Sequence, residues 1–306
     1  MNKNNPLVSV LIPAYNHEKY IQETIFSIIN QTYKNIELLV IDDGSNDSTF
    51  DKICELEIVC KKRFIHFEFE KQKNAGVITT MNLLLDKAKG DYVFINASDD
   101  VAAPHAIETE LSFLANNPGF VLCVGNNDII DGYGHRCFWD KSWNNVYSVS
   151  DAHFLSFSDS LTQTYPSIDF STDGFGSYYN LVYYGNHIPN GYLIKKAVFE
   201  KTGYYAKEAP LEDYWMMMQI AKHGKMKYIN DTLFYYRWHG DNVTFRIQGL
   251  YLTYKTLLHE LVSMFPGVQE FKDHSTEPEN RSIDYAGKIK ILGELFHNYY
   301  QKGKYR

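Results

Sequence analysis

Two acidic pairs, each found at the end of an apolar run, constrain the fold of this 306-residue chain most strongly. Asp42-Asp43 closes the run at residues 36–41, and Asp99-Asp100 follows the run at residues 92–95. Apolar runs of this length are typical of strands buried on both faces of a parallel sheet. Ligands bind such sheets outside the carboxyl ends of the strands, so the two pairs are predicted to share one site there.

Strand-like and helix-like patterns alternate along the first part of the chain. Short apolar runs predict strands at residues 8–12, 36–41, 65–69, 92–95 and 120–124. Apolar residues at helical spacing predict helices between them, at residues 21–29, 47–56, 78–88 and 105–116. This alternation, with short loops, predicts an α/β fold with a mostly parallel, doubly wound sheet flanked by helices.

The rest of the chain is less regular. Residues 126–186 are rich in Asn, Asp, Gly, Ser and aromatic residues, which predicts a long, partly ordered insertion over the sheet edge. Later patterns predict helices at 195–202, 212–223, 249–264 and 283–301, and a strand at 233–238. We therefore expect one domain at residues 1–244, with halves at about 1–125 and about 126–244, and a helical C-terminal extension at 245–306.

Charge and cysteine usage exclude several classes of protein. The net charge of -7 argues against a nucleic-acid partner, because phosphate backbones select basic surfaces. The four cysteines have no metal-ligand spacing and are expected as free thiols in a reducing cytosol. No apolar stretch approaches the roughly 20 residues of a membrane helix, and the apolar N-terminal run is too short for a signal peptide. A cytoplasmic protein is expected.

The C-terminal tail is basic and aromatic, and two interpretations of it stay open. Lys288, Lys290, Lys302, Lys304 and Arg306 interleave with aromatic residues between positions 288 and 306. Such a segment suits peripheral contact with the anionic inner face of the cytoplasmic membrane. It equally suits a packing helix with a solvated basic face. The tyrosines of the tail also offer a surface for a homodimer.

Beyond these patterns, the chain resembles the family 2 glycosyltransferases with the nucleotide-sugar-binding fold called GT-A. Six motifs in the family's order, spanning about residues 7–240, carry the resemblance. They are VSVLIPAYN at 8–16, LVIDDGS at 39–45, NAG at 74–76, GDYVFINASDD at 90–100, LEDYW at 211–215 and YYRWH at 235–239. The extension after residue 245 lies outside it.

The resemblance implies a donor site for a nucleoside diphosphate sugar, most simply a UDP-sugar. Its residues would be Pro13, Ala14, Tyr15, Asn16, Asp43, Asn74 and Asp99. Tyr15 would flank the base, and Asp43 would accept a hydrogen bond from the uracil ring N–H. Asp42 and Asp43 could instead form a turn with the following Gly44 and Ser45. The resemblance favours Asp43 as the binder and leaves the turn to its neighbour.

A divalent cation, Mn²⁺ or Mg²⁺, is the cofactor that the resemblance implies. Its ligands would come from Asp99, Asp100 and His239, because hard carboxylate oxygens suit these ions. The ion would offset the charge that develops on the departing diphosphate. The chain departs from the family at Ala97, where an acid usually stands, and at Met81, where a basic residue is frequent. The sequence does not decide which of the two aspartates binds the metal.

The LEDYW motif supplies the expected catalytic base. An inverting transferase needs one carboxylate to take the proton from the acceptor hydroxyl, and by resemblance this is Asp213. Acidic residues in the first turn of a helix also have a purely structural explanation, which is stabilisation by the helix dipole. On the acceptor side, the resemblance implies roles for Asn190, Gly191, Glu212 and Trp215.

The resulting expectation is a metal-dependent inverting enzyme that transfers a hexosyl or N-acetylhexosaminyl group to a glycan or lipid-linked saccharide. Such an activity would serve polysaccharide assembly at the cell envelope. The alternative is a non-catalytic relative that binds a nucleotide-sugar or glycan through a degenerate acidic motif. Nucleotidyl transfer and dinucleotide oxidoreduction are less favoured, because no glycine-rich phosphate loop follows a predicted strand.

Overall fold

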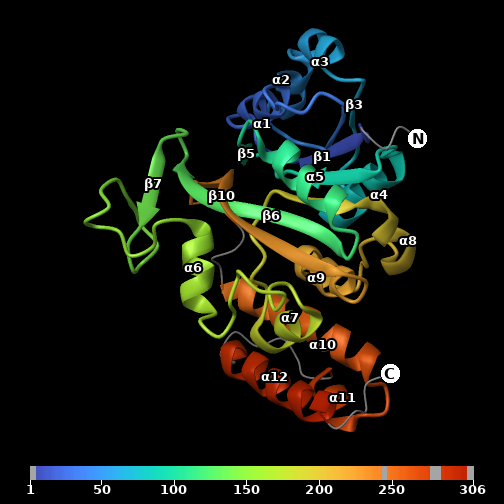
Figure 1. Cartoon of the computed structure of the whole chain (residues 1–306), viewed down its shortest axis with the longest axis vertical. Coiled ribbons are helices and arrows are strands. Elements are labelled where there is room, and N and C mark those ends of the chain that lie inside the picture. Colours follow the sequence, from blue (N-terminus) through green and yellow to red (C-terminus); the bar gives the residue numbers. More distant parts are fainter. Residues whose placement is uncertain (1–4, 241, 243–246, 276–283, 302–306) are drawn as a thin grey trace.

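One mixed sheet forms the centre of the computed structural model, which describes residues 5–240, 242, 247–275 and 284–301 (Figure 1). The strands follow the order β3-β2-β1-β4-β9-β6-β10-β5 across the sheet. They are β1 (Val8–Ala14), β2 (Ile36–Asp42), β3 (His66–Lys71), β4 (Tyr92–Ile95), β5 (Val101–Ala102), β6 (Phe120–Asp131), β9 (Tyr192–Lys195) and β10 (Lys225–Trp238). Two further strands, β7 (Arg136–Trp139) and β8 (Asn145–Val146), extend from β6.

The sheet is mostly parallel, as the sequence predicts. β1 pairs in parallel with β2 and β4, β2 pairs in parallel with β3, and β6 pairs in parallel with β10. The exception at the centre is β9, which lies antiparallel between β4 and β6. β9 was not expected as a strand. It joins the two parallel halves and brings the segment before it, with Asn190 and Gly191, to the ligand edge of the sheet.

Helices cover both faces of the sheet. They are α1 (Ile21–Ile29), α2 (Thr49–Cys54), α3 (Glu57–Arg63), α4 (Val77–Lys87), α5 (Ala106–Asn116), α6 (Phe157–Thr164), α7 (Tyr178–Tyr184), α8 (Phe199–Thr202), α9 (Glu212–Ala221), α10 (Ile247–Met264), α11 (Gln269–Ser275) and α12 (Tyr285–Gln301). Side chains of a strand point alternately to the two faces. Leu11 of β1 therefore joins one core with α4 and α9, whereas Val10 and Ile12 join another with α1 and α5.

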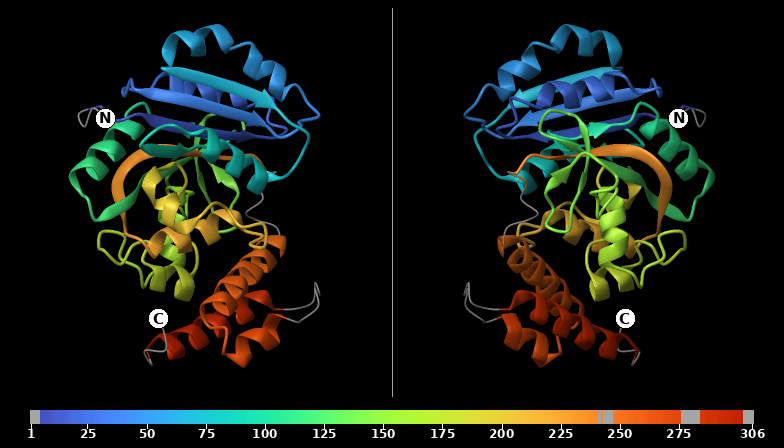
Figure 2. Two further views of the ribbon diagram at one scale, coloured as in Figure 1. Left: turned by 90° about the vertical axis from the view of Figure 1, so that its right-hand side faces the viewer. Right: turned by 90° about the vertical axis from the view of Figure 1, so that its left-hand side faces the viewer.

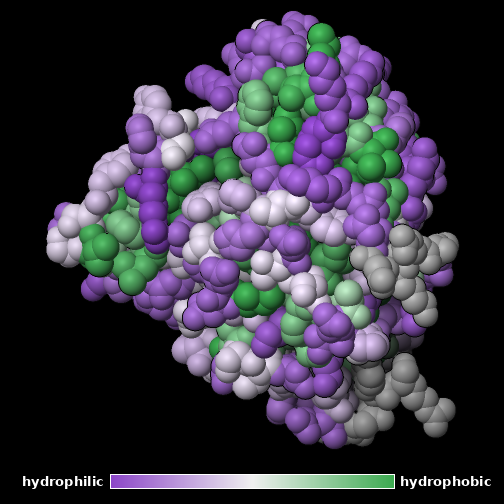
Figure 3. Space-filling view, turned by 45° about the horizontal axis from the view of Figure 1, so that its top comes forward, coloured by the Kyte–Doolittle hydropathy of each residue, from purple (hydrophilic) through white to green (hydrophobic). Residues whose placement is uncertain are grey.

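The predicted insertion begins later than expected, because β6 continues through residue 131. After it, β7 and β8 form an arm that projects from the body (Figure 1). Trp139 is fully buried at the base of the arm and packs with Ile129, Phe154 and Tyr236 in a small separate core. Apolar side chains gather on the outside of the arm in the space-filling view (Figure 3). Large exposed side chains after β6 include Tyr133, Tyr147, Val149 and Leu155.

The C-terminal helices pack against the rest of the protein below α7 and α9 (Figure 2). Phe296 of α12 is fully buried, and its ring lies 5.7 Å from that of Tyr179 on α7. The aromatic residues of α12 therefore serve as packing residues. The expected basic residues Lys302, Lys304 and Arg306 lie outside the described part of the chain. None of the described helices combines the length and the apolar character needed to cross a membrane.

Candidate functional site

The ends of β1 and β2 are tied together by short hydrogen bonds. The backbone N–H of Asp43 donates to the carbonyl oxygen of Ala14 at 2.8 Å. Asn16 has a φ of 52°, and its N–H donates to Ser45 Oγ at 2.9 Å. In return, Asn16 Oδ1 accepts from the N–H of Asn46 at 2.9 Å. This fixed double loop holds the predicted donor residues 13–16 next to the first acidic pair.

The two carboxylates of the first pair have different partners. Asp42 Oδ1 accepts from the N–H of Ser45 at 2.8 Å, so Asp42 forms the turn. Asp43 Oδ1 accepts from Gln72 Nε2 at 2.7 Å and from the N–H of Ala75 at 2.8 Å, and its Oδ2 accepts from the N–H of Gly76 at 2.9 Å. The Asp43 carboxylate therefore holds the loop that contains Asn74. The role of Asp43 in binding a base stays a proposal.

Three potential metal ligands converge where β1, β4 and β10 end. His239 Nε2 lies 3.1 Å from Asp99 Oδ2, and His17 Nε2 lies 3.9 Å from the same oxygen. The three ligand atoms all lie within 4.8 Å of one another. On its other side, His17 Nδ1 is hydrogen-bonded to Ser98 Oγ at 2.7 Å, which leaves Nε2 to face the cluster. Two imidazoles and one carboxylate make a donor set suited to a divalent transition metal.

The pKa shifts within this cluster favour the forms that bind metals. Burial lowers the pKa of His17, and the nearby His239 lowers it further, against the opposing effect of Asp99. Burial acts to raise the pKa of Asp99, but the hydrogen bond from His239 and the charges of the two histidines outweigh it and lower that pKa. A neutral imidazole and an ionised carboxylate are the forms that coordinate a cation.

Asp100 lies outside this cluster, so of the two aspartates that the sequence left open only Asp99 is placed with the histidines. Its Oδ1 accepts from the N–H of Arg237 at 2.8 Å, and its Oδ2 lies 3.4 Å from Asn190 Nδ2. Burial and the neighbouring Asp99 charge raise the pKa of Asp100 well above its ordinary value. The side chain of Arg237 is buried and donates from Nε to the carbonyl oxygen of Asp99 at 2.6 Å. Asp100 and Arg237 thus position the Asp99 loop.

A cavity of about 170 Å³ lies at the same edge of the sheet. Its lining brings together several of the predicted site residues from distant motifs: Pro13, Asn190, Gly191, Glu212 and Asp213. The two departures from the family pattern, Ala97 and Met81, line it as well. Trp215 of α9, predicted on the acceptor side, is partly buried against the core and does not line this cavity.

The pKa values of both acidic residues at the start of α9, Glu212 and Asp213, are raised. Burial raises the pKa of Asp213, and the hydrogen bond from the N–H of Tyr214 offsets part of this effect. Burial and the charge of Asp213 raise the pKa of Glu212 to about 7. A carboxylate whose pKa is moved toward neutrality is better matched to proton transfer near neutral pH. The arrangement is therefore suited to a general base at the cavity wall.

Sequence reasoning missed one residue of the cluster, His17. It directly follows the PAYN turn of the first motif, and that position at a strand end was the available signal. A single histidine in a loop carries little weight by itself, however. Only the packing of the β1–α1 loop against the Asp99 loop shows that residues 17 and 99 share a site.

Comparisons with known proteins agree with this arrangement. The model of the glycosyl transferase family 2 matches residues 9–171, which is more than half of the chain. An uncharacterized glycosyltransferase of Haemophilus influenzae is 38% identical over 133 residues, covering 44% of this chain and 52% of that protein. The chain thus matches only about half the length of this relative. The glycosyltransferase GlyG of Streptococcus pneumoniae is 26% identical over 243 residues, covering 76% of this chain and 70% of GlyG.

Solved structures share the fold. S. aureus TarS 1–349 in complex with UDP-GlcNAc superimposes with a TM-score of 0.59 at 17% identity, covering 96% of this chain and 72% of that chain. The mannosyltransferase PcManGT from Pyrobaculum calidifontis, in complex with GDP-Man and Mn²⁺, gives a TM-score of 0.61 at 13% identity, covering 97% of this chain and 76% of that one. The family-model match shows that the chain belongs to glycosyl transferase family 2, and the solved structures show that it has the GT-A fold.

Proposed function

We propose that the protein is a metal-dependent inverting glycosyltransferase that uses a UDP-linked donor. The observation behind this proposal is that His17, Asp99 and His239 converge at one edge of the sheet. Asp43 and Asp213 lie at the same edge. Sugar transfer from a nucleoside diphosphate requires a metal ion and a general base. His17, Asp99 and His239 would hold the metal, and Asp213 would be the base. Family membership supports transfer over a role restricted to binding.

The donor set fits Mn²⁺ better than Mg²⁺. Mg²⁺ prefers an octahedral shell of oxygen ligands, whereas two of the three ligand atoms here are imidazole nitrogens. When bound, the ion would neutralise charge that develops on the diphosphate leaving group. His17, Asp99 and His239 would hold it, and the buried Arg237 would keep Asp99 in place.

The remaining steps fall to residues of the chain itself. Asp43 would accept the base N–H while its own loop contacts keep the carboxylate rigid. Asp213 would accept the proton of the acceptor hydroxyl as that oxygen attacks the anomeric carbon from the side opposite the diphosphate. The C1–O bond to the diphosphate breaks as the new C1–O bond forms, so the anomeric configuration inverts.

The acceptor is proposed to be a hydroxyl of a glycan or a lipid-linked saccharide. Asn190, Gly191 and Glu212 line the cavity beside Asp213, where such a hydroxyl must approach. The fold neighbours were solved with different nucleotide-sugars, UDP-GlcNAc and GDP-Man, so the fold alone does not select the base. The uridine assignment depends on Asp43. Assembly of envelope polysaccharide at the inner face of the cytoplasmic membrane is the setting that we propose.

Calorimetric titration of UDP and GDP, each with and without Mn²⁺, tests the donor site. We expect binding of UDP that depends on Mn²⁺ and that Asp99→Asn abolishes. Asp91→Asn, an exposed aspartate of the same motif, is the matched control and should bind as the wild type does. Tighter binding of GDP than of UDP would contradict the uridine assignment. UDP binding of equal affinity with and without Mn²⁺ would contradict the metal site.

Transfer itself is tested by replacing the base. Asp213→Asn should lower the rate of UDP release from a UDP-sugar by roughly 10²- to 10⁴-fold, the usual contribution of a general base. The affinity for UDP should stay unchanged, because Asp213 is placed on the acceptor side. A variant that retains its rate would remove Asp213 from the mechanism.

A further inference from the structure

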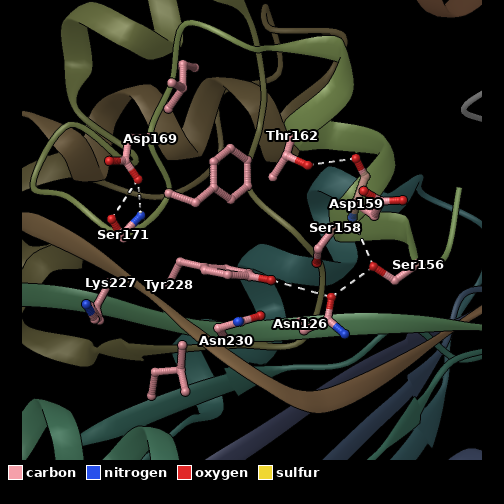
Figure 4. Close-up of a pocket in the computed structure, with 13 residues that line it drawn as sticks. Asn126, Ser156, Ser158, Asp159, Thr162, Asp169, Ser171, Lys227, Tyr228 and Asn230 are labelled. Carbon is pink, nitrogen blue, oxygen red and sulfur yellow. Dashed lines mark hydrogen bonds between the residues drawn. The ribbon is translucent and has the colours of Figure 1, made fainter.

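A second and larger cavity, of about 670 Å³, lies between β10, α6 and the segment at residues 165–171 (Figure 4). It shares no lining residue with the cavity at Asp213. The mechanism proposed above makes no use of it. Its floor is closed by buried residues such as Ser158 and Ile168, whereas Asp169, Ser171 and Asn230 at its rim are exposed.

Two aromatic rings give this cavity an apolar side. Phe170 is 6% exposed, and its ring meets that of Tyr228 edge-on at 5.3 Å between centroids. Tyr228 is half-buried, and its hydroxyl lies 3.4 Å from Asn126 Oδ1 (Figure 4). A half-buried ring with one polar end suits a ligand that is itself amphipathic. The C–H-rich face of a pyranose is such a ligand surface.

The remaining lining is rich in hydroxyl and amide groups. Asn126, Ser156, Ser158, Thr162, Ser171 and Asn230 all line the cavity. Hydroxyl and amide side chains both donate and accept hydrogen bonds, which matches the hydroxyls of a sugar. A few convergent polar groups against an aromatic surface are the usual make-up of a small-molecule site.

The charges of the lining disfavour an ionic ligand. One cation, Lys227, stands with two acids, Asp159 and Asp169. Asp169 is engaged by Ser171, whose N–H and Oγ donate to it at 2.9 Å and 2.6 Å. Asp159 Oδ2 accepts from the N–H of Leu155 at 2.8 Å. A diphosphate would need an excess of positive charge that this lining does not supply.

Two side chains of the cavity are available for a ligand. Lys227 and Asn230 make no side-chain hydrogen bond or ion pair within the described residues. Asn230 lies where the pairing of β10 with β6 is irregular, between Ile229 and Thr232. Such bulges commonly re-aim a side chain next to a binding site.

From these observations we propose that this cavity is a saccharide-binding site, separate from the donor site, that takes at least one neutral pyranose unit. Tyr228 provides the stacking face, and Asn230 and Ser171 provide hydrogen bonds at the rim. A distal sugar of the acceptor glycan is the occupant in the cell. That last assignment rests on the proposed transferase function, whereas the binding of a pyranose does not.

Saturation-transfer NMR tests the site with the methyl glycosides of glucose, galactose and N-acetylglucosamine. We expect saturation transfer to at least one of them, unchanged when UDP and Mn²⁺ are added. The transfer should fall at least fivefold in Tyr228→Ala and in Asn230→Ala. Tyr133→Ala, an 88% exposed tyrosine on the arm, is the matched control and should retain it. Asn230 is exposed, so its variant keeps the test valid even where Tyr228→Ala proves unstable.

Three outcomes would overturn the proposal. These are no saturation transfer to any glycoside, displacement of the glycoside by UDP, or equal signals in wild type and Asn230→Ala. The donor site is judged separately by UDP calorimetry on the same samples. If the protein binds a glycoside but not UDP, the proposed function is refuted and the saccharide site is supported. If it binds UDP but no glycoside, the saccharide site is refuted and the proposed donor site is supported.

Discussion

At the residue scale, the cluster of His17, Asp99 and His239 depends on how each side chain is held in position. Asp99 Oδ2 stands between the two imidazoles, at 3.1 Å from His239 and 3.9 Å from His17. The ring of His239 stacks on Tyr20 with 4.9 Å between centroids, and its side chain is only 6% exposed. A ligand held by packing loses little entropy when it binds, so this histidine is well prepared to coordinate a metal.

The first prediction concerns His17. His17→Ala should weaken Mn²⁺ binding roughly tenfold or more, because it removes one of three ligand atoms and leaves the other two in place. Calorimetric titration of Mn²⁺ in the presence of UDP measures the effect. Lys19→Ala, an exposed residue of the same loop, serves as the control. An unchanged Mn²⁺ affinity would exclude His17 from the metal shell.

The second prediction concerns pH. The pKa of Glu212 is raised to about 7, so Glu212 is protonated below that pH and ionised above it. Its ionisation places a negative charge beside Asp213, which strengthens Asp213 as a base. We therefore expect kcat/KM to rise through an inflection near pH 7 that Glu212→Gln removes, as measured by UDP release across a pH series. Glu208→Gln, an exposed neighbour, should keep the inflection. A wild-type profile flat through pH 7 would contradict this coupling.

At the scale of elements, local periodicity was enough to predict the framework. Strands β1, β2 and β4 are mostly apolar, and helices α1, α4 and α5 carry apolar residues at helical spacing. Both patterns follow from the burial that each element needs, and the sequence displays them directly. A turn with Gly44 and Ser45 was the alternative expected for the acidic pair, the resemblance left it to Asp42, and Asp42 forms it.

What the sequence could not predict depends on contacts between distant segments. β9 is only four residues long, and it becomes a strand because β4 and β6 both offer it partners. The end of β6 is polar, yet Asn127 is buried because it exchanges hydrogen bonds with the backbone of Asn190 at 2.8 Å and 3.0 Å. The placement of Asp99 rather than Asp100 in the cluster was equally hidden, since the Asp100 carboxylate is held away by the backbone N–H of Arg237, which is distant in sequence.

The third prediction concerns the turn before β9. Gly191 has a φ of +70°, and a Cβ there would lie 2.1 Å from the buried ring of Phe234. Gly203 has nearly the same φ, +71°, with nothing within 4 Å of the added atom. Both alanine variants carry the strain of a positive φ, which costs on the order of 1–3 kcal/mol. Gly191→Ala should lose about 1–3 kcal/mol more, from overpacking.

Urea unfolding of the two glycine variants measures this difference, because both glycines have a positive φ of nearly the same size. Equal free energies of unfolding would mean that Phe234 moves aside at no cost. In that case Gly191 would shape the cavity through its φ alone. A larger loss in Gly191→Ala would show that the close approach of β10 to this turn is rigid.

At the scale of the whole molecule, the C-terminal helices share a core with the helices that cover the sheet. Leu257, Leu261 and Phe296 belong to the same buried cluster as Tyr214 and Met217 of α9. The hydroxyl of Thr256 on α10 accepts from the N–H of Leu211 at 2.9 Å, directly before the acidic pair of the site. The division of the chain at residue 245 stays a prediction, and the packing gives a way to test it.

Glu260 is the polar centre of this contact. Its carboxylate accepts from Tyr178 Oη on α7 and from Gln219 Nε2 on α9, each at 2.7 Å. Lys222 Nζ, just after α9, lies 2.7 Å from the same carboxylate. The side chain of Glu260 is 3% exposed and that of Lys222 is 20% exposed, so the pair is largely withdrawn from water. Removing one member of such a pair leaves the other uncompensated.

The fourth prediction follows from this contact. Glu260→Ala should lower the free energy of unfolding by about 3–5 kcal/mol, whereas Glu260→Gln, which keeps a hydrogen-bonding side chain, should lose less. Glu294→Ala, exposed on α12, is the control and should change it by no more than about 0.5 kcal/mol. Urea unfolding followed by circular dichroism measures all three.

If α10 to α12 were an independent appendage, Glu260→Ala would split the transition in two and leave UDP binding intact. A single transition shifted as a whole, together with weakened catalysis, would show that these helices hold α9, and with it Asp213, at the cavity.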